Sequence, residues 1–253
     1  MRLKLLFFSR KLVYMNNPKL PWLLPIRSVL FLLIFVIGAS VTGKAVDEIT
    51  NWWTVVVTVV NVITIALLII TAKRSGISYK ELINYKKGIT KIRQVIVMIV
   101  IVFLVGMGFM YLTAFLLYGT VMPEPAVKMA APIPAVLAVI NFLLFPVTVP
   151  FAEDGLYLGY GVNRIKNDKL AVIIPAFFFA VQHCYIPVFF DVKYILYRFF
   201  SFLPLTLVLC WHYRKHRNPL PIMIAHGLID MSMSVMVLVM SLSPALYDSM
   251  INA

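Results

Sequence analysis

The chain has 253 residues, of which 62% are hydrophobic and only 13% are charged. Soluble domains are about half apolar and about a quarter charged, so this composition excludes an ordinary soluble domain and indicates a membrane protein. The net charge of +13 does not by itself indicate nucleic-acid binding, because cytoplasmic loops of membrane proteins also collect Lys and Arg. We therefore expect a lipid bilayer, and no nucleic acid, as the surroundings of this protein.

Seven apolar segments predict membrane-spanning helices, since a helix needs about 20 mainly apolar residues to cross a bilayer. The first and the fifth of them are short. The predicted fold class is all-α, a polytopic transmembrane helical bundle of about seven spans. In chain order the predicted spans are Ser28–Gly43, Trp52–Ala72, Val95–Leu117, Ile133–Gly159, Ala171–His183, Ile195–Tyr213 and Leu220–Met240.

Basic residues alternate between the two ends of the predicted spans. The basic connections are the amino terminus and the loops after the second, fourth and sixth spans, whereas the other connections hold mainly acidic residues beside a few lysines. Since cytoplasmic loops are the basic ones, the pattern predicts a multi-pass protein of the cell membrane with a cytoplasmic amino terminus. Residues of the basic connections include Arg2, Lys4, Arg10, Lys11, Lys19, Arg27, Lys80, Lys166 and Lys215.

Two basic features allow more specific expectations. Arg198 lies early in the sixth predicted span, where its long side chain can snorkel to the outer membrane face. The segment Ser75–Gln94 is either a basic interfacial helix or a solvated loop.

Ionisable residues also occur within or beside the predicted spans, where they are costly and indicate function. Glu153 and Asp154 follow Pro150, His183 follows Phe179 by one helical turn, and His226 and Asp230 share a helix face at i, i+4. Each of these three groups also has a purely structural alternative. The fourth span could end before Glu153, His183 could be a satisfied core group, and His226 and Asp230 could form a structural hydrogen bond.

Taken together, these residues are the parts of a peptide-hydrolysing site, namely a water-activating base, a histidine that shares its proton, and donors for an oxyanion. Glu153, His183 and His226 could equally bind Zn²⁺ with an open coordination position. No His-Glu-x-x-His motif occurs, so the zinc site of the zincin proteases is excluded.

The motifs resemble those of the CPBP intramembrane proteases, also called the CAAX protease and bacteriocin-processing or abortive-infection family. Its marks are Glu-Glu-x-x-x-Arg, Phe-x-x-x-His and His-x-x-x-Asn or Asp, which stand here as "EDGLYLG", "FAVQH" and "HGLID". The resemblance divides the chain into an amino-terminal region with three spans and a basic cytoplasmic loop (1–132), a CPBP-like core (133–240) and a tail (241–253).

The resemblance implies an intramembrane endopeptidase of a bacterial membrane that cuts a membrane-associated peptide or protein near the cytoplasmic face. Glu153 and His183 would activate a water, His226 and Asp230 would face the oxyanion, and Asp154 and Phe179 would support them. Whether a zinc ion takes part is open. An ionised Asp230 would repel the oxyanion, so it would have to be protonated or turned toward His226.

Two departures from the family pattern favour a second hypothesis. Asp154 replaces the second glutamate, and Leu158 replaces the arginine that is expected to fix the glutamate pair. They suggest a catalytically impaired membrane scaffold, or an immunity or regulatory protein, that keeps the fold. A third hypothesis is an ion or proton transporter. Because Leu158 lies at i+4 from Asp154, the substitution Leu158→Arg is predicted to be tolerated and to pair with Asp154.

Overall fold

The computed structural model describes residues 21–251, which form helices and, in that range, no strand beyond one isolated bridge between Tyr185 and Val188. The protein is an all-α membrane bundle, as predicted. The helices are α2 (Ile26–Thr42), η1 (Val46–Trp52), α3 (Trp53–Arg74), α4 (Tyr79–Leu82), α5 (Ile92–Tyr118), α6 (Glu124–Lys128), α7 (Ala135–Asp154), the π-helix η2 (Gly155–Val162), α8 (Asp168–His183), α9 (Val192–His216), α10 (Leu220–Leu242) and α11 (Pro244–Ile251).

Each of the seven predicted spans overlaps a helix of the bundle, and five helices are long and apolar enough to cross a membrane. These five are Val46–Arg74, Ile92–Tyr118, Ala135–Val162, Val192–His216 and Leu220–Leu242. The other two, α2 with 17 residues and α8 with 16, are shorter. Length therefore supports a multi-pass protein, whereas the count of seven crossings stays a prediction.

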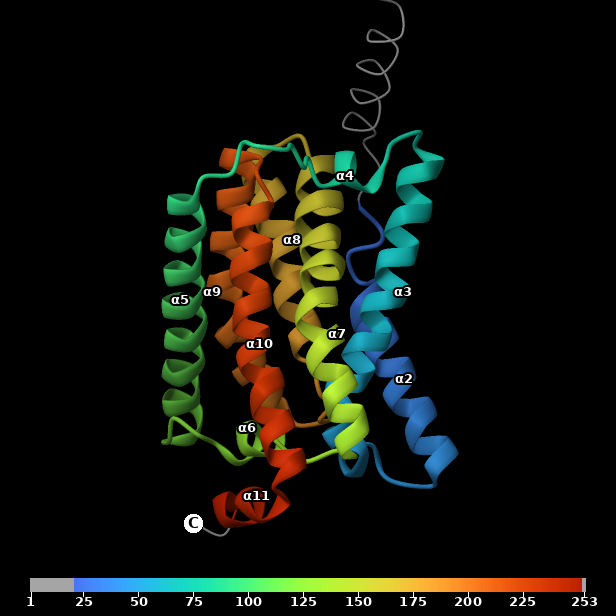
Figure 1. Cartoon of the computed structure of the whole chain (residues 1–253), viewed down its shortest axis with the longest axis vertical. Coiled ribbons are helices and arrows are strands. Elements are labelled where there is room, and N and C mark those ends of the chain that lie inside the picture. The colour runs from blue at the N-terminus through green and yellow to red at the C-terminus, as the bar shows by residue number, and fades with distance from the viewer. Residues whose placement is uncertain (1–20, 252–253) are drawn as a thin grey trace, which may run out of the picture.

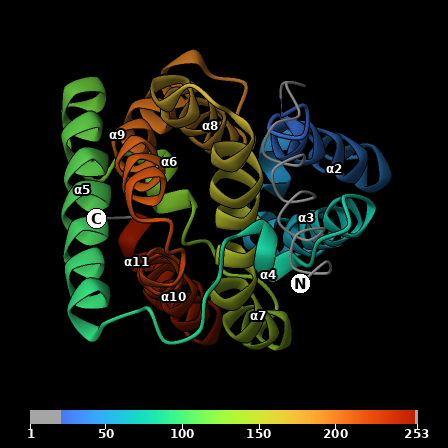
Figure 2. The ribbon, with the colours of Figure 1, turned by 90° about the horizontal axis from the view of Figure 1, so that it is seen from above.

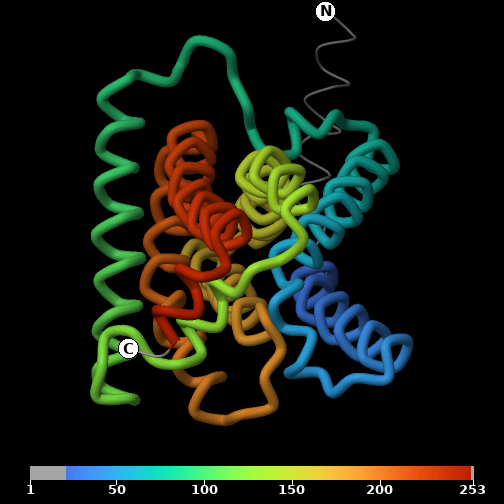
Figure 3. Tube along the Cα trace, turned by 60° about the horizontal axis from the view of Figure 1, so that its bottom comes forward, coloured from blue at the N-terminus to red at the C-terminus, as the bar shows by residue number. Residues whose placement is uncertain are grey.

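The bundle has a centre and two flanks. The antiparallel neighbours α7 and α10 run side by side, and α8 packs against α9 in the same way (Figures 1 and 3). Seen from above in Figure 2, α5 covers the outer side of α9 and α10, while α2 and α3 lie at the opposite edge. The exposed side of α5 is apolar, with Ile96, Leu104 and Leu116 all exposed, as expected of a surface that faces lipid.

The described basic connections gather at one end of the bundle. The α3–α5 connection that contains α4 lies at the top of Figure 1, together with the ends of η2 and α9, whereas α6 and α11 lie at the bottom. This placement agrees with the charge alternation between successive loops. The predicted cytoplasmic amino terminus, with Arg2 to Lys19, lies outside the described residues.

The structure decides between the two alternatives predicted for Ser75–Gln94, an interfacial helix and a loop. Only the single turn of α4 and the first residues of α5 are helical there, so the interfacial-helix alternative is wrong and the loop alternative holds. A capping box fixes the turn, because Ser78 accepts a bond from the Glu81 backbone N–H and the Glu81 side chain accepts one from the Ser78 N–H.

Candidate active site

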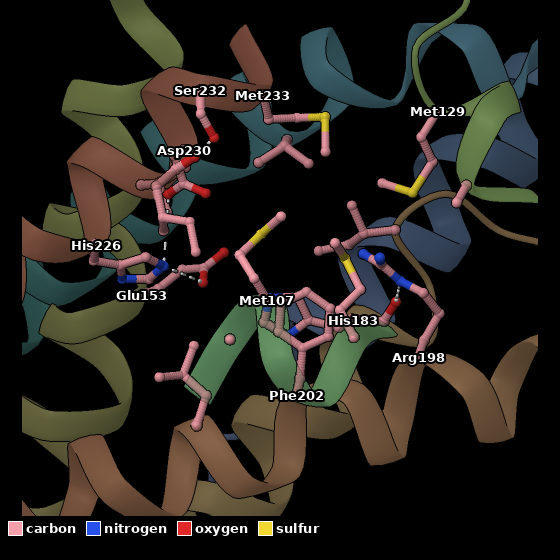
Figure 4. A pocket seen from close by; sticks show the side chains of 18 of the residues that line it. Met107, Met129, Glu153, His183, Arg198, Phe202, His226, Asp230, Ser232 and Met233 are labelled. Carbon is pink, nitrogen blue, oxygen red and sulfur yellow. Dashed lines mark hydrogen bonds and ion pairs between the residues drawn. The ribbon is translucent and has the colours of Figure 1, made fainter. Parts of the chain in front are cut away.

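His226 is surrounded by three carboxylates inside the bundle, of which Figure 4 shows those of Glu153 and Asp230. Its Nδ1 lies 3.1 Å from Oδ1 of Asp154, and its Nε2 lies 3.7 Å from Oε2 of Glu153 and 3.5 Å from Oδ2 of Asp230. Glu153, Asp154 and His226 are buried. The structure therefore brings four of the predicted residues together, and the idea that the helix ends before Glu153 with both acids in water is wrong.

The backbone of α7 and η2 explains how two adjacent carboxylates reach one histidine. Pro146 and Pro150 lie inside α7, and η2 continues the helix with π-helical geometry directly after Asp154. Because proline has no N–H, Pro150 leaves the carbonyl of Pro146 without its helical donor. A π-helical segment of this kind is rare and occurs mostly at functional sites.

Gly227 lets α10 approach α7 closely at this point. A Cβ atom at Gly227 would lie 2.9 Å from the carbonyl oxygen of Pro146, closer than real Cβ atoms come. Only glycine fits against this carbonyl, which has no helical hydrogen-bond donor. The neighbouring His226 is thereby held beside Glu153 and Asp154.

Arg27 completes the cluster from outside the predicted motifs. It is fully buried, and its Nη2 donates to Oε1 of Glu153 at 2.7 Å. The expectation that Arg27 belongs to the basic amino-terminal connection is wrong: it is the second residue of α2 and lies within the bundle. The one signal in the sequence was its position, an arginine two residues after Pro25 and directly before an apolar run.

Two more helices hold the Arg27 guanidinium in place, and η2 supports one of its partners. Its Nε donates to Oε1 of Gln182 on α8 at 2.5 Å, and its Nη1 donates to Oγ1 of Thr64 on α3 at 3.2 Å. Tyr157 of η2 donates its hydroxyl to the same Gln182 oxygen at 3.2 Å. A buried charge with this many partners is oriented as well as neutralised.

The side chain of Leu158 lies in apolar surroundings that do not suit the arginine of the family pattern. Its side chain is 0% exposed and packs in the hydrophobic cluster that contains Leu156 and Val162. Asp154 bonds to His226 rather than toward residue 158. The prediction that Leu158→Arg would be tolerated is therefore not supported.

His183 and Phe179 lie on another wall of the same pocket. His183 Nδ1 lies 2.8 Å from the Phe179 carbonyl oxygen, to which it donates, and its ring stacks on Phe202 with centroids 3.7 Å apart. The ring of Phe179 has its centroid 5.9 Å from both imidazole centroids, those of His183 and His226. Phe179 thus connects the two histidines, although His183 makes no direct bond to Glu153.

Zinc binding by Glu153, His183 and His226 stays a prediction. Among residues 21–251, no group of three His, Cys, Asp or Glu side chains is arranged to hold a metal ion. The carboxylate of Glu153 is also already engaged by Arg27, whose charge disfavours a cation at this position.

A cavity of about 250 Å³ opens beside the cluster. Glu153, His183, His226 and Asp230 line it, and most of its other lining is apolar. Each of the three carboxylates has one oxygen without a hydrogen-bond partner: Oε2 of Glu153, Oδ2 of Asp154 and Oδ2 of Asp230. Buried oxygens of this kind are costly unless they bind something, so polar ligands are expected there.

Arg198 also lines this cavity, and its predicted snorkelling to the outer membrane face is wrong. Only 4% of the residue is exposed, and its Nε donates to the carbonyl oxygen of His183 at 3.1 Å.

Tyr79 ties the basic α3–α5 connection to the site helix. Its hydroxyl donates to the Phe151 carbonyl oxygen at 2.5 Å, and Gly155 leaves room for it, since a Cβ there would clash with the hydroxyl. Burial, and to a lesser degree the nearby Asp154 carboxylate, raise the pKa of Tyr79 well above its ordinary value. The hydroxyl therefore stays protonated and keeps donating to the helix.

Residues 135–232 match the family model described as type II CAAX prenyl endopeptidase Rce1-like. This segment holds all the motif residues, from Glu153 to Asp230. The chain contains an Rce1-like domain of the CPBP family. No curated protein and no solved structure matches the chain.

The matched family is one of proteases, and the five apolar helices indicate a multi-pass membrane protein. The domain begins with α7 and ends within α10. Arg27, which binds Glu153, lies 108 residues before it on α2.

Proposed function

We propose that this protein is an intramembrane endopeptidase that hydrolyses a peptide bond of a membrane-associated peptide or protein. The observation that carries the proposal is the position of His226 Nε2, which faces both Glu153 and Asp230 beside an apolar cavity. A base, a proton carrier and a water-poor pocket are the elements that peptide hydrolysis needs.

Glu153 is the general base in this proposal. Arg27 binds its Oε1 and leaves Oε2 without a partner at 3.7 Å from His226 Nε2. Oε2 takes a proton from a water, whose oxygen forms a bond to the scissile carbonyl carbon. The activation is assigned to Glu153 because its Oε2 has no hydrogen-bond partner and its side chain lines the cavity.

His226 and Asp230 act at the other side of the same reaction. Asp154 accepts the Nδ1–H of His226, which fixes the tautomer and directs Nε2 into the pocket. Nε2 receives the proton that Glu153 has taken from the water, donates it in a hydrogen bond to the oxyanion, and passes it to the leaving amine as the C–N bond breaks. Asp230, at 3.5 Å from Nε2, orients the imidazole rather than binding the oxyanion.

His183 and Phe179 bound the pocket. The Nδ1–H of His183 is held by the backbone, so its Nε2 is the free acceptor, which suits a second contact to the attacking water or to the substrate. Phe179 packs against both histidines and so holds their rings in position.

Two contacts favour the endopeptidase over the scaffold alternative. Asp154, which replaced a glutamate, bonds to His226, and Arg27 supplies the charge that Leu158 cannot. We propose further that the basic end of the bundle faces the cytoplasm of a bacterial cell, so that cleavage takes place on that side of the membrane.

Replacement of Glu153 tests the function. The protein is reconstituted in liposomes with a library of apolar, membrane-anchored peptides, and new peptide termini are identified by mass spectrometry. We expect Glu153→Gln to abolish cleavage, and His226→Ala to reduce it by a factor on the order of 10² or more. The matched control is Glu124→Gln, because Glu124 is an exposed carboxylate that pairs with Lys128 at 2.7 Å.

A second control separates chemistry from folding. Glu153→Gln leaves the Arg27 guanidinium without its carboxylate, so the double variant Arg27→Gln, Glu153→Gln serves as a charge-balanced reference. Cleavage by Glu153→Gln at the wild-type rate would refute the proposed role and return the scaffold hypothesis.

A further inference from the structure

Arg198 is a buried cation without a counter-ion. Its Nε donates to the His183 carbonyl oxygen, and its guanidinium carbon lies 4.7 Å from the centroid of the Phe202 ring. Within residues 21–251, no carboxylate lies within ion-pair distance of it. This contrasts with Arg27, which has a carboxylate and two neutral acceptors.

The guanidinium of Arg198 points into the cavity (Figure 4). Around it the figure labels Met107, Met129 and Phe202, none of which accepts a strong hydrogen bond. An unpaired charge in such surroundings is unfavourable, so an anion is expected to bind there.

The free edge of the guanidinium identifies the anion's chemistry. Since Nε is used by His183, the two Nη groups are left, and they form a planar fork of donors. Such a fork binds a carboxylate through two parallel hydrogen bonds.

The charges of the cavity are separated between its two sides. Figure 4 shows Glu153, His226 and Asp230 on one side and Arg198 on the other. A substrate with a carboxylate is repelled by Glu153 and Asp230 and attracted by Arg198. It can enter in only one orientation, with its scissile bond at the acidic side.

We propose that Arg198 is an anion-binding subsite that holds a carboxylate of the peptide substrate, and so sets which peptide bond reaches Glu153. This inference rests on the proposed endopeptidase function. The carboxylate is either the free carboxyl terminus of the peptide or an Asp or Glu side chain near the cut.

Binding of matched peptides to the full-length protein in detergent tests the subsite. The probes are one apolar peptide with a dodecanoyl anchor, prepared as the free carboxylic acid, as the carboxyl-terminal amide, and as the amide with Asp in the last position. We expect at least one acidic form to bind more tightly than the neutral amide by a factor on the order of 10 to 10². The acidic peptide that binds more tightly identifies the source of the carboxylate, either the carboxyl terminus or an acidic side chain.

Arg198→Met should reduce this ratio to about 1, and Arg198→Lys should keep part of it, because lysine retains the charge but lacks the fork. The matched control is Lys193→Met, since Lys193 is an exposed cation on the same helix that does not line the cavity. Its ratio should equal that of the wild type.

Two results would overturn the subsite: equal binding of acid and amide by the wild type, which needs no variant to be folded, or an acid preference that persists in Arg198→Met. A fourth probe, dodecyl phosphate, tests a lipid phosphate as the occupant. Arg198-dependent binding of this probe without any preference among the peptides also refutes a peptide carboxylate.

The binding assay requires no turnover, so it separates this inference from the proposed function. An Arg198-dependent acid preference in a protein that cleaves nothing would refute the endopeptidase and leave the subsite standing. Cleavage of peptide amides and acids alike, with equal affinities, would refute the subsite alone.

Discussion

At the scale of single residues, the site depends on how its buried charges are compensated. Three carboxylates, those of Glu153, Asp154 and Asp230, surround one imidazole, and a single arginine, Arg27, binds one of them. Because isolated buried charges are unfavourable, each of these groups depends on its neighbours. Substitutions at this site are therefore expected to be strongly non-additive.

The pair of Arg27 and Glu153 allows a direct measurement of this dependence. Arg27→Gln leaves a buried carboxylate unpaired, which should lower the free energy of unfolding by about 3–5 kcal/mol. The double variant Arg27→Gln, Glu153→Gln removes both charges and should recover most of that loss while staying inactive. Thermal unfolding of detergent-solubilised protein measures both; additive losses in the double variant would show that the two residues do not interact.

Leu158→Arg tests whether the family's arginine position is still usable. Leu158 lies in the core cluster with no exposed surface, so a new guanidinium there has no partner and must displace packed side chains. We expect a large fall in the yield of folded protein from membranes. Leu158→Met, which keeps the volume and the apolar character, should fold as well as wild type; a well-folded, active Leu158→Arg protein would contradict the buried position.

At the scale of elements, the contact between α7 and α10 determines the geometry of the site. The carbonyl that Pro150 leaves free on Pro146 lies against Gly227, one residue from His226. The helices can come this close only because one residue lacks a side chain and the other lacks a helical hydrogen bond.

Gly227→Ala should therefore displace His226 relative to Glu153. The added methyl group cannot move past a backbone carbonyl, and a shift of about 1 Å in a catalytic group can lower a rate by about 10²-fold. The measurements are the cleavage rate and the melting temperature. The control is Gly108→Ala on α5, where a Cβ meets no atom within 4 Å, and it should change neither quantity.

At the scale of the whole molecule, the bundle has one basic end and a site within its interior. The loops that hold Lys80 and Lys215 are predicted to face the cytoplasm. Single cysteines at these positions, in a background without Cys184 and Cys210, should react with a membrane-impermeant reagent only after the cells are opened. Labelling of position 80 or 215 in intact cells would reverse the orientation.

Much of this architecture could be predicted from the sequence, because apolar runs and loop charges are local signals. All seven predicted spans correspond to helices, and the motif residues pointed to one cluster around His226. The arginines could not be placed in this way. Arg27 and Arg198 were interpreted as loop and interface charges, since nothing in their own neighbourhoods shows a partner that is distant in the chain.

The π-helical segment after Asp154 and the packing of Leu158 could not be predicted from the sequence either. An i, i+4 rule assumes regular α-helical geometry, and η2 departs from it over Gly155–Val162. The one-turn helix α4 and the terminal helix α11 were likewise missed, because both are too short to show a periodic pattern.

The ion pair between α2 and α7 also constrains how the protein is made. Arg27 and Glu153 are 126 residues apart in the chain, so the ribosome completes α2 and all of α3 and α5 before the carboxylate exists. During that interval α2 carries an arginine without its carboxylate partner, which is unfavourable in the bilayer. We therefore expect insertion of α2 to be completed late in synthesis, and a chain that stops before residue 153 to remain open to proteolysis.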